Sequence, residues 1–229
     1  MAARWLSTVA LISICAASAS AAFMIFDILL GHRQKMVIMN LVWPITAFYF
    51  GPFALWPYWR LGRQSVSQKP FWQSTFVSST HCGAGCVLGD VIGEWTVFLF
   101  GITIAGSKLL ADYVLDFALA YSFRIAFQYF AIVPMRHLRP AEGIKEAIKA
   151  DTIALVAFEV GMFAWMAFAA KAFFGVPPHP DSAVYWFMMQ IGMIVGFATT
   201  YLANWRADET RRQGRNVAIL QKANAAYQR

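Results

Sequence analysis

The chain has 229 residues, of which 59% are hydrophobic, 16% aromatic and only 14% charged. Soluble domains carry roughly 25% charged residues and about 45–50% apolar ones, so this composition excludes an ordinary soluble protein. It indicates a multi-pass membrane protein, with the lipid bilayer as its first partner. The net charge of +7 does not indicate a nucleic-acid partner, because Lys and Arg gather in loops and at the C-terminus, as they do in cytoplasmic segments of membrane proteins.

Six apolar stretches are each longer than the roughly 20 residues that cross about 30 Å of hydrocarbon. They predict an all-α bundle of six transmembrane helices, near residues 5–29, 36–58, 80–106, 111–134, 152–174 and 183–204. The first stretch contains a signal-peptide-like Ala-Ser-Ala-Ser-Ala, but its apolar run continues to Leu30, which favours an uncleaved anchor. The second contains three prolines and is expected to be kinked. We expect one transmembrane domain over 1–205 and a basic cytoplasmic tail over 206–229.

The distribution of Lys and Arg predicts the orientation of these spans. One set of segments holds 14 of these residues: the N-terminus, 59–79, 135–151 and the C-terminus. The other set holds 4, in 30–36, 107–110 and 171–182. Because cytoplasmic loops carry the excess of Lys and Arg, both termini are expected in the cytoplasm of a bacterial inner membrane.

Residues 81–94 read His-Cys-Gly-Ala-Gly-Cys-Val-Leu-Gly-Asp-Val-Ile-Gly-Glu, inside the third stretch. Membrane helices normally exclude polar groups, so these must be compensated. Glycines that recur every four residues lie on one helical face, and this packing seam lets a neighbouring helix approach closely. This face holds Gly85, Gly89, Gly93 and Gly101. A second stripe lies about 100° away and holds Cys82, Cys86, Asp90 and Glu94.

The sequence offers a candidate metal site at the start of this segment. His81, Cys82 and Cys86 supply an imidazole and two thiols, the ligands of a soft or borderline ion such as Cu(I) or Zn(II). Their convergence requires the helix to start at or just after His81, and Met135 is a candidate further ligand. The alternative is that both cysteines are small packing residues, since buried cysteine commonly has that role. The methionines elsewhere are better explained as packing residues than as copper ligands.

Other polar residues fall within the predicted spans. Asp90, Arg124 and Glu159 share one depth, so we expect Arg124 to pair with Asp90 or Glu159, because an unpaired charge there costs about 2.5–3.5 kcal/mol. Together these residues predict a polar track across the membrane, consisting of Asp90, Glu94, Asp112, Asp116, Arg124, Gln128, Glu159 and Gln190. The alternative is a structural ion-pair network that fixes helix packing.

The chain resembles a bacterial family of integral membrane proteins of unknown function, marked by a His-Cys-x-x-Gly-Cys-x-x-Gly-Asp signature. The signature stands here at residues 81–90, and the resemblance extends over Phe-Gln-Tyr-Phe at 127–130, Lys-Ala-Asp-Thr at 149–152 and Trp-Phe-Met-Met-Gln at 186–190. It covers most of the chain from Asn40 to Asn204. The family implies no established activity. Its members occur together with copper-binding cupredoxin-type domains, so the resemblance favours copper and a copper-protein partner.

Three functions remain open from the sequence. The first is binding or transport of a transition metal, copper above all, with His81, Cys82 and Cys86 as cytoplasmic-side ligands. The second is a structural or assembly subunit of a larger membrane complex. The third is a proton-coupled carrier of another solute that uses Asp90 and Glu159. The chain carries no Walker loop, dinucleotide fingerprint, HExxH or CxxCH, so nothing in the sequence requires an enzyme.

Overall fold

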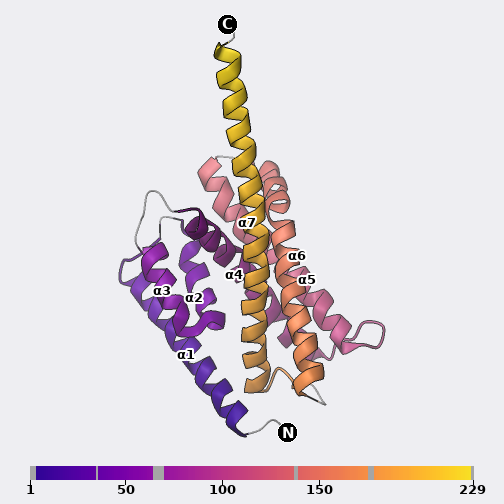
Figure 1. Ribbon diagram of the computed structural model, residues 1–229. Helices are drawn as coiled ribbons and strands as arrows, with labels where there is room; N and C mark the ends of the chain where they lie inside the picture. Colours follow the sequence, from indigo (N-terminus) through magenta and orange to yellow (C-terminus); the bar gives the residue numbers. More distant parts are fainter. Residues whose placement is uncertain (1–3, 35, 64–69, 137–138, 175–177, 228–229) are drawn as a thin grey trace.

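The computed structural model describes residues 4–34, 36–63, 70–136, 139–174 and 178–227 (Figure 1). Within these ranges the structure is all-helical and has no strand, which confirms the expected fold class. The long helices are α1 (Arg4–Leu29), α4 (Phe71–Phe100), α5 (Lys108–Arg136), α6 (Pro140–Phe173) and α7 (Ala183–Tyr227). The shorter helices are α2 (Met39–Phe50), η1 (Gly51–Ala54), α3 (Leu55–Pro57) and η2 (Tyr58–Arg63).

Four helices of the described chain are long and apolar enough to cross a membrane. They are α1, α4, the Asp151–Phe173 part of α6 and the Ala183–Thr210 part of α7. α5 has 29 residues and is also long enough, but it carries Lys108, Asp112, Asp116 and Arg124. The chain is therefore a membrane protein by the length and composition of its helices.

The second expected span, over 36–58, is not one helix in the structure. α2 has only 12 residues, so its rise of about 18 Å falls short of about 30 Å of hydrocarbon. It ends at Gly51, whose φ of +57° is a conformation that favours glycine. The segments η1, α3 and η2 then return alongside α2. The Trp43 and Tyr58 ring centroids are 5.9 Å apart, and the Trp43 indole lies against Gly62.

The returning segments contact the C-terminal end of α1, which lies at the end of the bundle where α2 begins. The Tyr58 hydroxyl donates a hydrogen bond to Asp27 Oδ2 at 2.7 Å. Arg63 Nη2 lies 3.5 Å from Asp27 Oδ1 and 2.6 Å from His32 Nε2. Residues 39–63 therefore form a hairpin that enters and leaves at one end of the bundle, and this corrects the expected crossing over 36–58.

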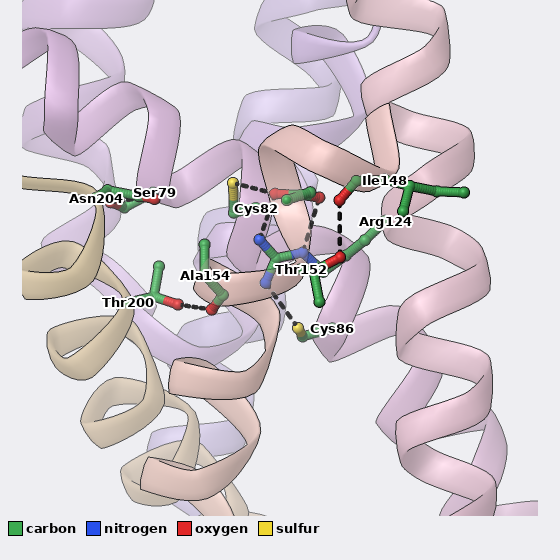
Figure 2. A network of polar contacts seen from close by, with 10 residues as sticks. Ser79, Cys82, Cys86, Arg124, Ile148, Thr152, Ala154, Thr200 and Asn204 are labelled. Atoms are coloured by element: carbon green, nitrogen blue, oxygen red, sulfur yellow. Dashed lines mark hydrogen bonds and ion pairs between the residues drawn. The ribbon is translucent and has the colours of Figure 1, made fainter. Parts of the chain in front are cut away.

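The hydrophobic core joins α1 and the hairpin to the other long helices. α4 packs most extensively against α5, and α6 against α7. The middle of α7 is hydrogen-bonded to two other helices. Thr200 donates to the Ala154 carbonyl on α6, and Asn204 Nδ2 donates to Ser79 Oγ on α4 at 3.1 Å (Figure 2). Beyond the bundle α7 continues as a helix to Tyr227, and the two chain ends lie at opposite ends of the molecule (Figure 1).

Single cysteines placed at Arg33, Arg60 and Thr103 test the hairpin in a Cys15→Ser background. We expect a membrane-impermeant maleimide to label Arg33→Cys and Arg60→Cys from the same side of the membrane, because both positions are exposed at the end of the bundle to which the hairpin returns. Thr103→Cys, in the connection between α4 and α5, should be labelled from the other side. The native Cys82 and Cys86 are buried and should not react. Labelling of positions 33 and 60 from opposite sides would show that residues 36–58 cross the membrane.

Candidate functional site

The site begins with the close approach of α4 and α5. Three glycines of α4 lie where an added Cβ would collide with α5. The pairs are Gly85 with Arg124, Gly89 with Ala120 and Gly93 with Asp116. Gly101 lies outside this contact, because it ends α4 with φ of +62° and has no atom near the position of a Cβ. Spacing of four residues thus brings the backbone of α5 against α4 and directs polar side chains of α5 toward the bundle interior.

Arg124 and Asp151 form a buried two-pronged ion pair between α5 and α6. Arg124 Nε donates to Asp151 Oδ2 at 3.0 Å, and Arg124 Nη2 donates to Asp151 Oδ1 at 2.5 Å. Arg124 is 1% exposed and Asp151 is 4% exposed. The planar guanidinium matches the two oxygens of one carboxylate, which makes this a strong and directional contact. The expectation that Arg124 pairs with Asp90 or Glu159 is wrong, because Asp151 is its ion-pair partner.

Both cysteine thiols of α4 contact this ion pair. The Cys82 thiol donates to Asp151 Oδ1 at 3.1 Å, and Arg124 Nη1 donates to Cys86 Sγ at 3.4 Å. Figure 2 shows the two sulfur atoms on either side of the Arg124 guanidinium. Both thiols are free and buried. The stripe of α4 that carries them therefore faces the junction of α5 and α6.

His81 does not join the two thiols. It lies ten residues into α4, since the helix begins at Phe71, so the expected helix start at His81 is wrong. Its ring instead lies against Phe127 on α5, with ring centroids 6.3 Å apart. The side chain of Met135 lies outside the described residues. In the described part of the chain, no three His, Cys, Asp or Glu side chains are grouped as a metal ion would require.

A cluster of buried carboxyl groups begins one helical turn from Cys86. It is formed by Asp90 and Glu94 of α4, Asp116 of α5 and Glu159 of α6, none more than 6% exposed. Asp90 interacts electrostatically with all three of the others. Neither oxygen of Asp90, Asp116 or Glu159 makes a hydrogen bond of good geometry among the residues that the structure describes, although Glu159 lies beside the Cys86 thiol and Asp116 beside the Glu94 carboxyl group. This cluster therefore concentrates acidic groups in the membrane interior without an ion pair of its own in the described chain, since Arg124 and Lys108 act on Glu159 and Glu94 only at longer range.

Of the remaining residues of the expected track, Asp112 interacts electrostatically with Glu94 and Asp116, whereas the two glutamines have other surroundings. Gln190 joins α7 to the N-terminal helices, because it accepts a hydrogen bond from Ser13 and donates one to the Phe48 carbonyl, each at 2.7 Å. Gln128 is half-buried on α5. Asp112 lies one turn beyond Asp116, toward the end of the bundle that holds the connection between α4 and α5.

A cavity of about 630 Å³ opens at that end of the bundle. Its wall includes Glu94, Asp112, Tyr113 and Tyr185. Glu94 belongs both to this wall and to the carboxyl cluster, and it interacts electrostatically with the Tyr185 phenol. The cavity, the cluster and the Arg124–Asp151 pair therefore follow one another along α4, which rises about 5.4 Å per turn.

Asp151 is a residue of this candidate site that the sequence did not predict. Its position at the edge of an apolar stretch, after Lys149, placed it in the loop 135–151 rather than in the bundle. The structure instead continues α6 through this region from Pro140, which carries Asp151 inward. A signal was present, because Lys-Ala-Asp-Thr at 149–152 was one of the segments of the family resemblance.

Residues 71–209 match the family model described as "Domain of unknown function (DUF4396)". The match spans more than half of the chain, so the chain belongs to this family. It begins at Phe71 rather than at Asn40, and so includes α4, α5, α6 and most of α7 but excludes α1 and the hairpin. All residues of the ion pair, the thiol contacts and the carboxyl cluster lie within it. No curated protein and no solved structure matches the chain.

Paired substitutions test the energetic role of the buried ion pair. Arg124→Met and Asp151→Leu should each lower the free energy of unfolding by about 3–5 kcal/mol, because each leaves an uncompensated charge in the interior. The double variant should lose clearly less than the sum of the two. Reversible unfolding in mixed micelles measures these values, with the exposed Arg139→Met as the control that should change little. Additive losses would show that the two side chains act independently.

Proposed function

We propose, for this member of the DUF4396 family, that the helices α4 to α7 form a proton-coupled carrier. One observation carries the proposal: three carboxyl groups, of Asp90, Asp116 and Glu159, are buried together without a hydrogen bond of good geometry in the described chain. The nearby Arg124 cannot neutralise them all, since it is bonded to Asp151. Intramembrane acidic residues of this kind mark proton relays and ion pathways in membrane proteins.

The physical argument concerns how these carboxyl groups remain buried. Several carboxylates in contact repel one another and lose their hydration, so a fully ionised cluster is strongly unfavourable. The cluster avoids this cost by holding protons or by binding a cation in their place. A group of acids that shares protons also releases them in coupled steps. Exchange of a proton for a solute cation at such a cluster is the elementary step of a proton-coupled carrier.

The proposal includes a revised orientation in the membrane. With 39–63 returning as a hairpin, the crossings are α1, α4, α5, α6 and α7, five in place of the six expected. Residues 30–36 then join the other basic segments on one side, which holds 15 Lys and Arg against 3 on the opposite side. The excess assigns this side to the cytoplasm of a bacterial inner membrane. The C-terminus is then cytoplasmic, the N-terminus external, and the cavity opens to the outside.

In this orientation the polar residues form a path from outside to inside. The cavity leads to Glu94, and Asp90 and Asp116 lie next along the interior. Glu159 follows at the level of Cys86, where the Arg124–Asp151 pair joins α5 to α6. The pair closes the cytoplasmic end of the path in this structure. Opening that end requires α5 and α6 to separate or their ion pair to exchange partners.

Proteoliposomes that contain a pH-sensitive dye test the carrier proposal. A potassium gradient with valinomycin sets the membrane potential, and proton entry is recorded alone and with Na⁺, Cu⁺, Zn²⁺ or an organic ammonium ion. We expect Asp90→Asn to slow the protein-dependent proton flux by about 100-fold or more, because it removes a group that transfers the proton. Asp181→Asn is the matched control, since this aspartate is exposed. Wild-type protein that behaves like empty liposomes under every condition would overturn the proposal and favour the assembly-subunit hypothesis.

Copper binding is the second candidate function. The observation that favours it is the position of Cys82 and Cys86, whose thiols both contact the Arg124–Asp151 pair and so lie near one point. Thiolates are good ligands for Cu(I). Metal could bind there only if the two thiols released this pair, and Asp151 or His81 would have to supply any further ligand.

Elemental analysis of protein purified from copper-supplemented cells tests this second candidate. If the thiols hold copper, the wild type should retain about one equivalent of copper per chain. The double variant that combines Cys82→Ser and Cys86→Ser should retain no copper. Cys15→Ser is the matched control, because Cys15 is exposed on α1. Equal copper contents in all variants would contradict metal binding at the two thiols.

A further inference from the structure

We infer that the cavity at the outer end of α4 to α7 is a binding site for an organic ammonium ion, a small molecule that combines a positive charge with an apolar body. This inference rests on the proposed function, since such a solute would be the cargo of the carrier. Three features of the cavity carry it: its size, its unpaired carboxylate and its aromatic wall.

The size of the cavity suits a small organic molecule. Ligand sites in proteins typically occupy about 300–1,000 Å³ and combine apolar walls with a few polar groups. The volume here, about 630 Å³, lies in this range and far exceeds the space of a bare metal ion. Apolar side chains, among them Met162, Met166 and Met189, line much of it.

The buried acidic groups of the cavity favour a cation, whereas the basic side chains that also line it, Lys108, Lys171 and His179, are more exposed. Asp112 lines the wall, is only 9% exposed, and its Oδ1 has no hydrogen-bond partner in the described chain. Glu94 lies deeper on the same wall. Lys108 stands at the mouth, but its Nζ lies over the Phe98 ring at 5.0 Å from the centroid, where it makes a cation–π contact. A carboxylate buried beside apolar walls without an ion-pair partner is a site for a cationic ligand.

The aromatic wall selects an organic cation over an inorganic one. The rings of Tyr113 on α5 and Phe163 on α6 stack at 4.2 Å between centroids, and both line the cavity. Tyr185 adds a further ring beside Glu94. Ring faces attract ammonium groups electrostatically, and this is how proteins recognise quaternary ammonium ions. Carboxylates and aromatic rings on one wall thus match both parts of the solute.

The position of Glu94 links this site to proton exchange. Glu94 lines the cavity and also interacts electrostatically with Asp116 in the carboxyl cluster. A cation bound beside Asp112 and Glu94 stabilises their ionised forms, so protons held nearby are released as it binds. No covalent step is involved. The expected sequence is binding of the cation from outside and release of a proton from the cluster.

Isothermal titration calorimetry of the full chain in nanodiscs tests the inference with three probes of similar size. They are benzyltrimethylammonium, neutral benzyl alcohol and anionic benzenesulfonate. We expect the ammonium ion to bind at least about tenfold more tightly than the other two. Asp112→Asn should weaken its binding by about tenfold or more, because it removes the unpaired carboxylate. Asp181→Asn should leave the affinity unchanged, since this exposed aspartate does not line the cavity.

A second variant keeps the test decisive if Asp112→Asn does not fold. Tyr113→Leu keeps an apolar side chain but removes a ring of the wall, and it should also weaken binding of the ammonium probe. Equal affinities for all three probes, or no binding of the ammonium ion, would overturn the inference. Binding of Cu(I) that is lost in Met162→Leu and Met166→Leu, without ammonium binding, would assign the cavity to a soft metal instead.

Ammonium binding and proton transport are measured in separate experiments, so each proposal can be overturned without the other. Binding is measured at equilibrium, so it does not depend on transport. Ammonium binding without proton flux in liposomes would overturn the carrier alone. Proton flux without ammonium binding would overturn the assignment of this cavity alone.

Discussion

The arrangement of the interior depends on one ion pair, between Arg124 of α5 and Asp151 of α6. Arg124 is the one fully buried Lys or Arg in the described chain, and a fork of two hydrogen bonds commits it to one carboxylate. Its place is set by Gly85, against which its own backbone packs. Because Arg124 is bonded to Asp151, it makes no ion pair with the other interior acids and acts on Glu159 only at longer range. The glycine contact and the ion pair together therefore create the unpaired carboxyl cluster.

The two ends of the four helices α4 to α7 differ in structure. At one end, the thiols of Cys82 and Cys86 contact the Arg124–Asp151 ion pair. At the other end, Asp112 and Glu94 line a cavity. A structure that is open at one end and closed at the other is what a carrier requires in one of its alternating states. The match of the family to 71–209 places both ends within the shared domain, whereas α1 and the hairpin lie outside it.

The sequence predicted the all-helical fold because long apolar runs separated by basic loops leave few other folds in a membrane. It did not predict the hairpin, since the apolar run over 36–58 is as long as a crossing. Only the turn at Gly51 and the contacts of Tyr58 with Asp27 show that the chain returns. The acids of the predicted polar track are buried, but the prediction omitted Asp27 and Asp151 and paired Arg124 by depth along each span. Asp151 was counted outside the membrane, and a depth argument cannot show which side chains face each other.

The proposed carrier requires that the carboxyl groups of the cluster hold protons. Infrared spectroscopy of the purified protein measures this directly, because a protonated carboxyl group has a carbonyl stretch distinct from that of the ionised form and shifts in D₂O. We expect such a band in the wild type at neutral pH and its clear reduction in Asp90→Asn and Glu159→Gln, but not in the exposed control Asp181→Asn. A spectrum that shows only ionised carboxylates, the same in every variant, would show that the cluster holds no protons.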